Sequence, residues 1–321
     1  MATTTASPSR TTPTTTSAFP LGYFVLAFAF TWSFWWLAVL EARGLIPPLP
    51  VPAQGLGVLG PLVAAVVLTA REGGGAGLRD LLRRIVRWRV APVWYGVVLL
   101  GPVLLYLASM ALEVALGGQP PSPGALVGAL PTVFVYAAYM VVFVAIGEEV
   151  GWRGYALPRL QSGHGALLAS VVLGTMWALW HLPLFFNPDL FYSNLPFVVQ
   201  LALQIPLAIL LTWVFNSTGG SVLMAILLHA MVNASGQLWK AMPEYSAEPA
   251  SAAQAAAATT HTNVMFAIVV GVAAVVVVLV YGPRDLSRHP QEVSNTPYAG
   301  SGEPTASRVR LGTRTGKRRS V

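Results

Sequence analysis

Eight stretches of this chain are apolar enough, and long enough or nearly so, to cross a lipid bilayer. A crossing helix takes about 20 residues, and the second stretch is the shortest of the set. The first is long and Trp-rich and has no basic segment before it, so it is interpreted as a retained helix instead of a signal peptide. The pattern predicts an all-α, polytopic membrane bundle. The expected spans are residues 20–40, 53–70, 92–116, 126–147, 165–186, 196–215, 220–239 and 263–281.

Composition supports this division of the chain into one membrane domain with two tails. The sequence is 55% hydrophobic and only 10% charged, whereas soluble domains carry about 25% charged residues. Residues 1–19 are rich in Thr, Ser and Pro and are predicted to be a disordered tail, as is the basic segment 282–321. Residues 20–281 form the expected membrane-embedded domain. Within it, the Ala-rich stretch 246–260 is expected to be an external loop or a weak surface helix.

The placement of positive charge predicts the orientation of the bundle. With the N-terminus inside, all but two of the 19 Lys and Arg residues fall on the inner side, the exceptions being Arg43 and Lys240. An even number of spans then places both termini in the cytoplasm. The Ala-, Gly- and Arg-rich composition favours a bacterial cytoplasmic membrane as the location.

A basic segment between the second and third spans, LRDLLRRIVRWRV (78–90), has apolar residues at helical spacing and arginines on much of the other face. It is predicted to lie in the membrane interface, with lipids as partners. Nucleic acid is not an expected partner, because the segment is tethered between two spans. The chain contains no cysteine, which excludes disulfides, thiol nucleophiles and cysteine–zinc sites.

Ionisable residues inside the apolar runs are candidates for function. A charge at the centre of a membrane helix costs at least about 2.5–3.5 kcal/mol on insertion scales, so its presence calls for a partner or a role. The fourth run ends in GEEVGWRGY, the fifth contains WALWH and the seventh contains HAMVN. The candidate site residues in these three runs are Glu148, Glu149, Arg153, His181, His229 and Asn233.

Helical spacing divides the two glutamates between different tasks. Glu149 and Arg153 are four residues apart, so they share a helix face and can pair. Glu148 is rotated from them by about 100° and is the freer carboxylate, which suits a general base. Gly147 and Gly151 flank the pair as GxxxG and would allow another helix to approach closely.

The histidines add groups that can act on a carbonyl. His229 and Asn233 are four apart and project from one face, where they can polarise a carbonyl or hold an oxyanion. His181 follows Trp177 by one turn and precedes Pro183, which should kink or end the helix. Taken singly, a membrane histidine is more often an interhelical hydrogen-bonding group, and a glutamate pair at a boundary is more often interfacial. Their concentration on three helices favours a site.

A carboxylate with imidazoles is suited to activating water, with or without a metal. The sequence has no HExxH, no GxSxG and no phosphate-binding glycine loop. Attack of water on a peptide carbonyl fits best. A transporter or channel using the same residues is the alternative from another class, although no inverted repeat supports it. For Glu148 to meet His181, the fourth helix must continue past Arg153.

Three motifs resemble those of one known family, the CPBP family of CAAX proteases and bacteriocin-processing enzymes, which includes the type II CAAX prenyl proteases. EEVGWR at residues 148–153 matches its EExxxR motif. WALWH is similar to FxxxH, with Trp177 in the place of the aromatic residue and His181 as the histidine. HAMVN matches HxxxN through His229 and Asn233.

The resemblance implies an intramembrane endopeptidase whose core motifs span residues 147–233. It implies that Glu148 activates the water with help from His181, while His229 and Asn233 stabilise the oxyanion. It leaves open a zinc ion held by Glu148, His181 and His229. The implied substrate is a membrane-anchored peptide or protein, prenylated or not. A non-catalytic member of the same fold, acting in bacteriocin immunity or as a scaffold, is the alternative.

Overall fold

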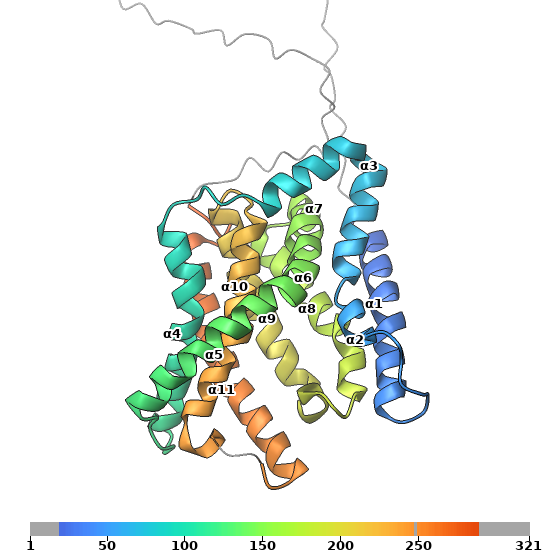
Figure 1. Cartoon of the computed structure of the whole chain (residues 1–321). Coiled ribbons are helices and arrows are strands. Elements are labelled where there is room, and N and C mark those ends of the chain that lie inside the picture. The colour runs from blue at the N-terminus through green and yellow to red at the C-terminus, as the bar shows by residue number, and fades with distance from the viewer. Residues whose placement is uncertain (1–18, 247–248, 289–321) are drawn as a thin grey trace, which may run out of the picture.

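The computed structural model describes residues 19–246 and 249–288, and this part of the chain is helical without any strand (Figure 1). Nearly all of both predicted tails lies outside the described residues. The α-helices are α1 (Leu21–Ala42), α2 (Ala53–Gly57), α3 (Gly60–Ile85), α4 (Val93–Ala115), α5 (Pro123–Met140), α6 (Ile146–Gly151), α7 (Leu157–Gly163), α8 (Ala166–Trp180), α9 (Phe197–Ser217), α10 (Val222–Ser235) and α11 (Ala252–Tyr281).

Eight helical segments among the described residues have the length and composition to cross a membrane. This confirms the predicted all-α bundle and marks the chain as a multi-pass integral membrane protein. The orientation of the bundle stays a prediction. The seventh segment, Val222–Ala241, is the most buried of the eight, so α10 lies in the interior of the bundle and is contacted by α4, α5 and α9.

The fourth span is longer than its apolar run, reaching from Pro123 to Gly163. Two π-helical turns, Val141–Ala145 and Trp152–Ala156, separate α5, α6 and α7 and bracket the short α6. Single π turns inside a helix are frequent at functional sites. In Figure 1 the α5 segment runs obliquely across the front of the bundle, whereas α7 stands nearly upright. The helix therefore continues past the glutamate pair, as expected if Glu148 is to lie near His181.

Small residues bring α6 close to the start of α3. A Cβ atom on Gly151 would lie 2.4 Å from the carbonyl oxygen of Pro61, and one on Gly147 would lie 3.0 Å from that of Val58. The first distance leaves no room for a side chain, and at the second Val58 would have to shift. The GxxxG pair thus does allow the expected close approach, with α3 and the residues just before it as the partner.

The basic segment comprises the second half of α3 and the five residues that follow it. Gly74 adopts φ 53° and ψ −145° inside this helix, a conformation that favours glycine, and the helix bends there to run across the top of the bundle (Figure 1). Leu81 turns inward and is buried, while Trp88 is 59% exposed. Arg84 donates from Nη1 to the carbonyl of Gly154 at 2.9 Å. Protein contacts as well as amphipathicity therefore position this segment.

The Ala-rich stretch differs from its expectation, because from Ala252 onward it belongs to one continuous 30-residue helix, α11. Alanine is the strongest helix former, and the hydroxyl of Ser251 caps the helix by accepting from the N–H of Gln254 at 3.2 Å. Two of the polar residues before the apolar run, Thr262 and Asn263, bond to carbonyls of their own helix. Thr262 donates to the carbonyl of Ala258 at 2.9 Å.

Residues 282–288, assigned from sequence to the tail, pack against the start of α8. The N–H of Ala166 donates to the carbonyl of Arg284 at 2.7 Å, and that of Leu167 to the carbonyl of Pro283 at 2.9 Å. These bonds satisfy N–H groups that a helix start leaves without partners. Leu286 is fully buried.

Candidate active site

Glu148 projects from α6 toward α8 and is buried there. Its Oε2 accepts a hydrogen bond from the indole Nε1–H of Trp177 at 2.6 Å. The described structure records no ion pair to Glu148, in agreement with its expected rotation away from Arg153. The carboxylate is therefore held by a neutral donor and is not neutralised by direct contact with a cation.

Glu149 forms the expected pair with Arg153 and also reaches α10. Its Oε1 accepts from Nη1 of Arg153 and from Nδ1 of His229, each at 2.8 Å. The side chains of Glu149 and Arg153 are fully buried. Because a carboxylate can only accept, Nδ1 of His229 carries a proton, and Nε2 is left on the far side of the ring.

His181 is fixed by the turn that precedes it. Its Nδ1 lies 2.8 Å from the carbonyl oxygen of Trp177. A carbonyl can only accept, so Nδ1 carries the proton and Nε2 of the neutral ring has a free lone pair. The α8 helix ends at Trp180 and a 3₁₀ turn, Leu182–Phe186, follows. Pro183 thus ends the α-helix close to where its position predicted.

Asn233 lies one turn beyond His229 on α10 and is half-buried. Its Nδ2 is 3.7 Å from the sulfur of Met140 at the end of α5. Thioether sulfur is a weak acceptor. The amide N–H can therefore leave the sulfur and hydrogen-bond to a better acceptor, such as a substrate carbonyl, at little cost.

Trp177 is the residue that joins these groups. Its ring lies 5.2 Å, centroid to centroid, from that of His229 in an edge-to-face contact, and 6.2 Å from that of His181. The guanidinium carbon of Arg153 lies 5.0 Å from the ring centroid. The side chain of Trp177 is therefore the point on which candidate residues from α6, α8, α10 and the π turn after α6 converge. Asn233 is oriented separately.

The predicted zinc ligands do not form a metal-binding group as they are placed. Within the described part of the chain, no three His, Cys, Asp or Glu side chains are grouped so that they could hold a metal ion. Oε2 of Glu148 is occupied by Trp177, and Nδ1 of each histidine is occupied by the acceptors named above.

Tyr192 is a site residue that sequence reasoning missed. It lies in the 3₁₀ turn Phe191–Asn194, and its ring centroid is 5.4 Å from that of His181. Burial, with the negative charge of Glu148, raises the pKa of Tyr192 above its usual value, so its hydroxyl stays protonated at neutral pH. A tyrosine in a connecting loop has no spacing signal that would have identified it.

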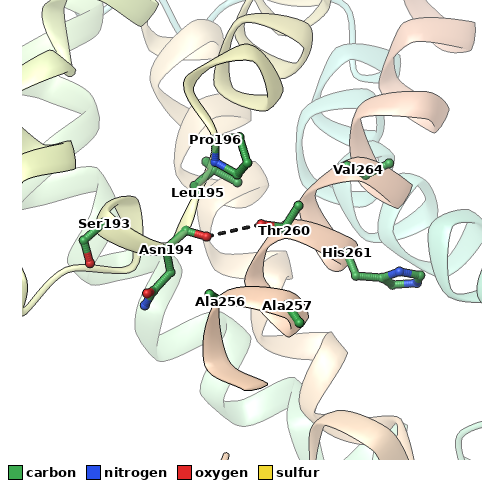
Figure 2. Close-up of a pocket in the computed structure, with 9 residues that line it drawn as sticks. All are labelled: Ser193, Asn194, Leu195, Pro196, Ala256, Ala257, Thr260, His261 and Val264. Carbon is green, nitrogen blue, oxygen red and sulfur yellow. Dashed lines mark hydrogen bonds between the residues drawn. The ribbon is translucent and has the colours of Figure 1, made fainter. Parts of the chain in front are cut away.

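A cavity of about 710 Å³ lies beside this turn but away from the candidate residues. Figure 2 shows it between the 193–196 segment and the first half of α11, where the hydroxyl of Thr260 donates to the carbonyl of Asn194. His261 lines the cavity and pairs through Nε2 with Glu113 of α4. None of the six predicted site residues lines it.

Similarity to known proteins covers the same region as the converging residues. The family of type II CAAX prenyl endopeptidases described as Rce1-like matches residues 130–235, a range that includes all six candidates. The chain is also 28% identical over 234 residues to the CAAX prenyl protease 2 of Methanococcus maripaludis, an alignment covering 68% of this chain and 84% of that protein.

Proposed function

We propose that this chain, which belongs to the Rce1-like family of type II CAAX prenyl endopeptidases, hydrolyses a peptide bond near a membrane-anchored segment of its substrate. The family points to an intramembrane protease. The observation that carries the proposal is the convergence of Glu148, His181 and His229 around Trp177. We place the enzyme in a bacterial cytoplasmic membrane on the basis of composition.

In the proposed reaction, Glu148 is the general base and His181 orients the water. Glu148 takes a proton from the water while the oxygen attacks the carbonyl carbon. Nε2 of His181 accepts a hydrogen bond from that water, because Nδ1 is committed to the carbonyl of Trp177. Collapse of the tetrahedral intermediate breaks the C–N bond, and the proton held by Glu148 passes to the leaving amine. The products are a carboxylate and an amine.

The oxyanion is stabilised by donors from α10. Asn233 offers an amide N–H, and His229 offers Nε2–H when its ring is protonated. Glu149 orients His229 through the bond to Nδ1 and supplies the negative charge that balances a protonated ring. Arg153 holds Glu149 in turn. We therefore assign Glu149 and Arg153 to positioning, one step removed from the reacting atoms.

The substrate class follows from the setting of the site. A general base in the interior of a membrane bundle acts on peptides that reach it from the bilayer. The relative named CAAX prenyl protease 2 supports a prenylated carboxyl-terminal peptide as the first candidate. An unprenylated membrane-anchored peptide is the second.

Cleavage of a peptide panel by the purified protein tests the proposal. Farnesylated and unmodified peptides would be incubated with native protein and with Glu148→Gln, His181→Ala and His229→Ala, and the products identified by mass spectrometry. We expect each substitution to lower kcat at least about 100-fold. Glu113→Gln is the matched control, since Glu113 is also a buried, hydrogen-bonded carboxyl outside the proposed site.

Three results would contradict the proposal. Undiminished turnover by Glu148→Gln would remove that residue from the chemistry. Loss of activity in a metal chelator, with recovery on adding zinc, would replace the metal-free mechanism. Ion flux through reconstituted protein that depends on the same residues, without proteolysis, would support a transporter.

A further inference from the structure

We propose that Trp177 is a positioning residue whose indole N–H holds Oε2 of Glu148 and so presents Oε1 as the oxygen that takes the proton from water. The inference rests on the proposed function, because it assigns a task within that reaction. It goes beyond the motif resemblance, in which the residue at this position is only an aromatic ring.

The hydrogen bond is short and shielded from solvent. Nε1 and Oε2 are 2.6 Å apart, and the exposed fractions of Trp177 and Glu148 are 2% and 3%. A donor bound to a carboxylate makes a stronger bond than one between neutral groups. The described structure gives Glu148 no ion pair. The indole of Trp152 also lies near this carboxylate, but its N–H forms no hydrogen bond, so the N–H of Trp177 is the donor that sets which way the carboxylate turns.

The indole is itself held by two neighbouring side chains and by the packing of its own helix. Arg153 lies over the ring, and His229 meets it in an edge-to-face contact. One turn earlier, Gly174 has no room for a side chain, since a Cβ atom there would lie 2.8 Å from the Cα of Ile205. Close packing of α8 on α9 thus fixes the helix that carries Trp177, and the N–H cannot follow a moving carboxylate.

Trp177 acts on the two catalytic groups through different atoms. Its main-chain carbonyl fixes the tautomer of His181, and its side chain fixes the carboxylate of Glu148. Phenylalanine, which the FxxxH motif has at this position, would keep the carbonyl and most of the ring contacts but could not donate. The Trp-for-Phe difference therefore adds a specific interaction to this site.

The test replaces the N–H while keeping the ring. Trp177→Phe is one variant, and substitution of Trp177 by 3-benzothienylalanine, in which sulfur replaces the N–H in a ring of nearly the same shape, is the second. Trp32→Phe is the matched control, since Trp32 also donates its indole N–H, at 3.0 Å to the carbonyl of Trp180, but has no contact with Glu148. In peptide cleavage, we expect both Trp177 variants to lower kcat about tenfold or more with little change in KM, and the control to match native protein.

A second readout does not depend on activity. Dicyclohexylcarbodiimide labels buried carboxyl groups that can take up a proton, and mass spectrometry gives the rate at each glutamate. Removing the donor that stabilises the carboxylate should speed labelling of Glu148 several-fold in both Trp177 variants and leave labelling of Glu113 unchanged. A merely structural role for Trp177 would not produce this site-specific effect in the benzothienyl variant.

The outcomes separate the two proposals. If native protein cleaves peptides and both Trp177 variants match it in turnover and labelling, the positioning role is overturned while the proposed function stands. If native protein cleaves nothing, the proposed function fails, and the labelling rates still decide whether Trp177 controls Glu148. If Trp177→Phe fails to fold, the benzothienyl variant decides both measurements.

Discussion

At the scale of single residues, the buried charges around Glu149 are balanced within one small group. Arg153 and His229 both donate to the same carboxylate oxygen at 2.8 Å. This arrangement answers the question that the charged pair raises in an apolar run, because each group lowers the cost of burying the others. It also makes the group vulnerable, since removing one member leaves a buried charge without its partner.

Arg153→Met should therefore destabilise the protein by about 3 kcal/mol or more, while the double variant Glu149→Gln, Arg153→Met should recover much of that loss. The physical reason is that methionine removes the cation but leaves the buried carboxylate, whereas the double variant removes both charges. Thermal unfolding in detergent would measure the difference. If the double variant lost as much stability as the two single variants added together, the pair would not be energetically coupled.

At the scale of the helices, the π-helical turns and the glycines set where α6 sits. The π turns on either side of α6 each add a residue to one turn, which changes the direction in which the following side chains project. Gly147 and Gly151 then let α6 contact the backbone at the start of α3. The position of the glutamate pair thus depends on backbone packing that involves no catalytic side chain.

Gly151→Ala should lower stability and activity together, because the added Cβ would lie 2.4 Å from the Tyr23 hydroxyl and from the Pro61 carbonyl. Overpacking of this kind costs about 1–3 kcal/mol. Gly128→Ala in α5 is the matched control, since a Cβ there meets nothing within 4 Å. We expect the control to be neutral or slightly stabilising. Equal melting temperatures for the two variants would contradict a close α3–α6 contact.

At the scale of the whole molecule, the site is assembled from segments far apart in the chain and lies in its most buried part. α10 carries His229 in the interior of the bundle, and α6 and α8 carry the acidic group and the second imidazole. Successive spans run in alternating directions in Figure 1. The charge distribution of the loops is therefore predicted to orient all eight spans together.

Reporter fusions test this orientation. A fluorescent protein fused after Val321 should fluoresce, and alkaline phosphatase inserted in the 43–52 loop should be active, because the positive-inside rule places the basic segments in the cytoplasm. Alkaline phosphatase fused after Val321 should be inactive, and a fluorescent protein inserted in the 43–52 loop should not fluoresce. An active phosphatase after Val321 would reverse the predicted orientation and show that the loop charges do not decide it.

Much of the site was predictable because local spacing along a helix carries the information. Four-residue separation was enough to pair Glu149 with Arg153, and the EExxxR, FxxxH-like and HxxxN motifs identified the histidines. The contact between Glu149 and His229 was not predictable, because nothing in a sequence states which faces of two distant helices meet. The same limit applies to the loop that brings Tyr192 onto His181.

Composition and spacing alone identify a multi-pass helical membrane protein with few intramembrane polar residues, because burial in lipid leaves a composition signal in every span. Three sequence motifs also resemble those of the CPBP family. Which atoms meet depends on how the helices pack and could not be read from these patterns. Trp177 was an aromatic residue of unspecified role until α6 and α8 were packed together, and its N–H became a partner of Glu148 through that packing alone. Hydrogen bonds depend on the distance and angle between groups on separate helices, and neither is set by residue type or local spacing.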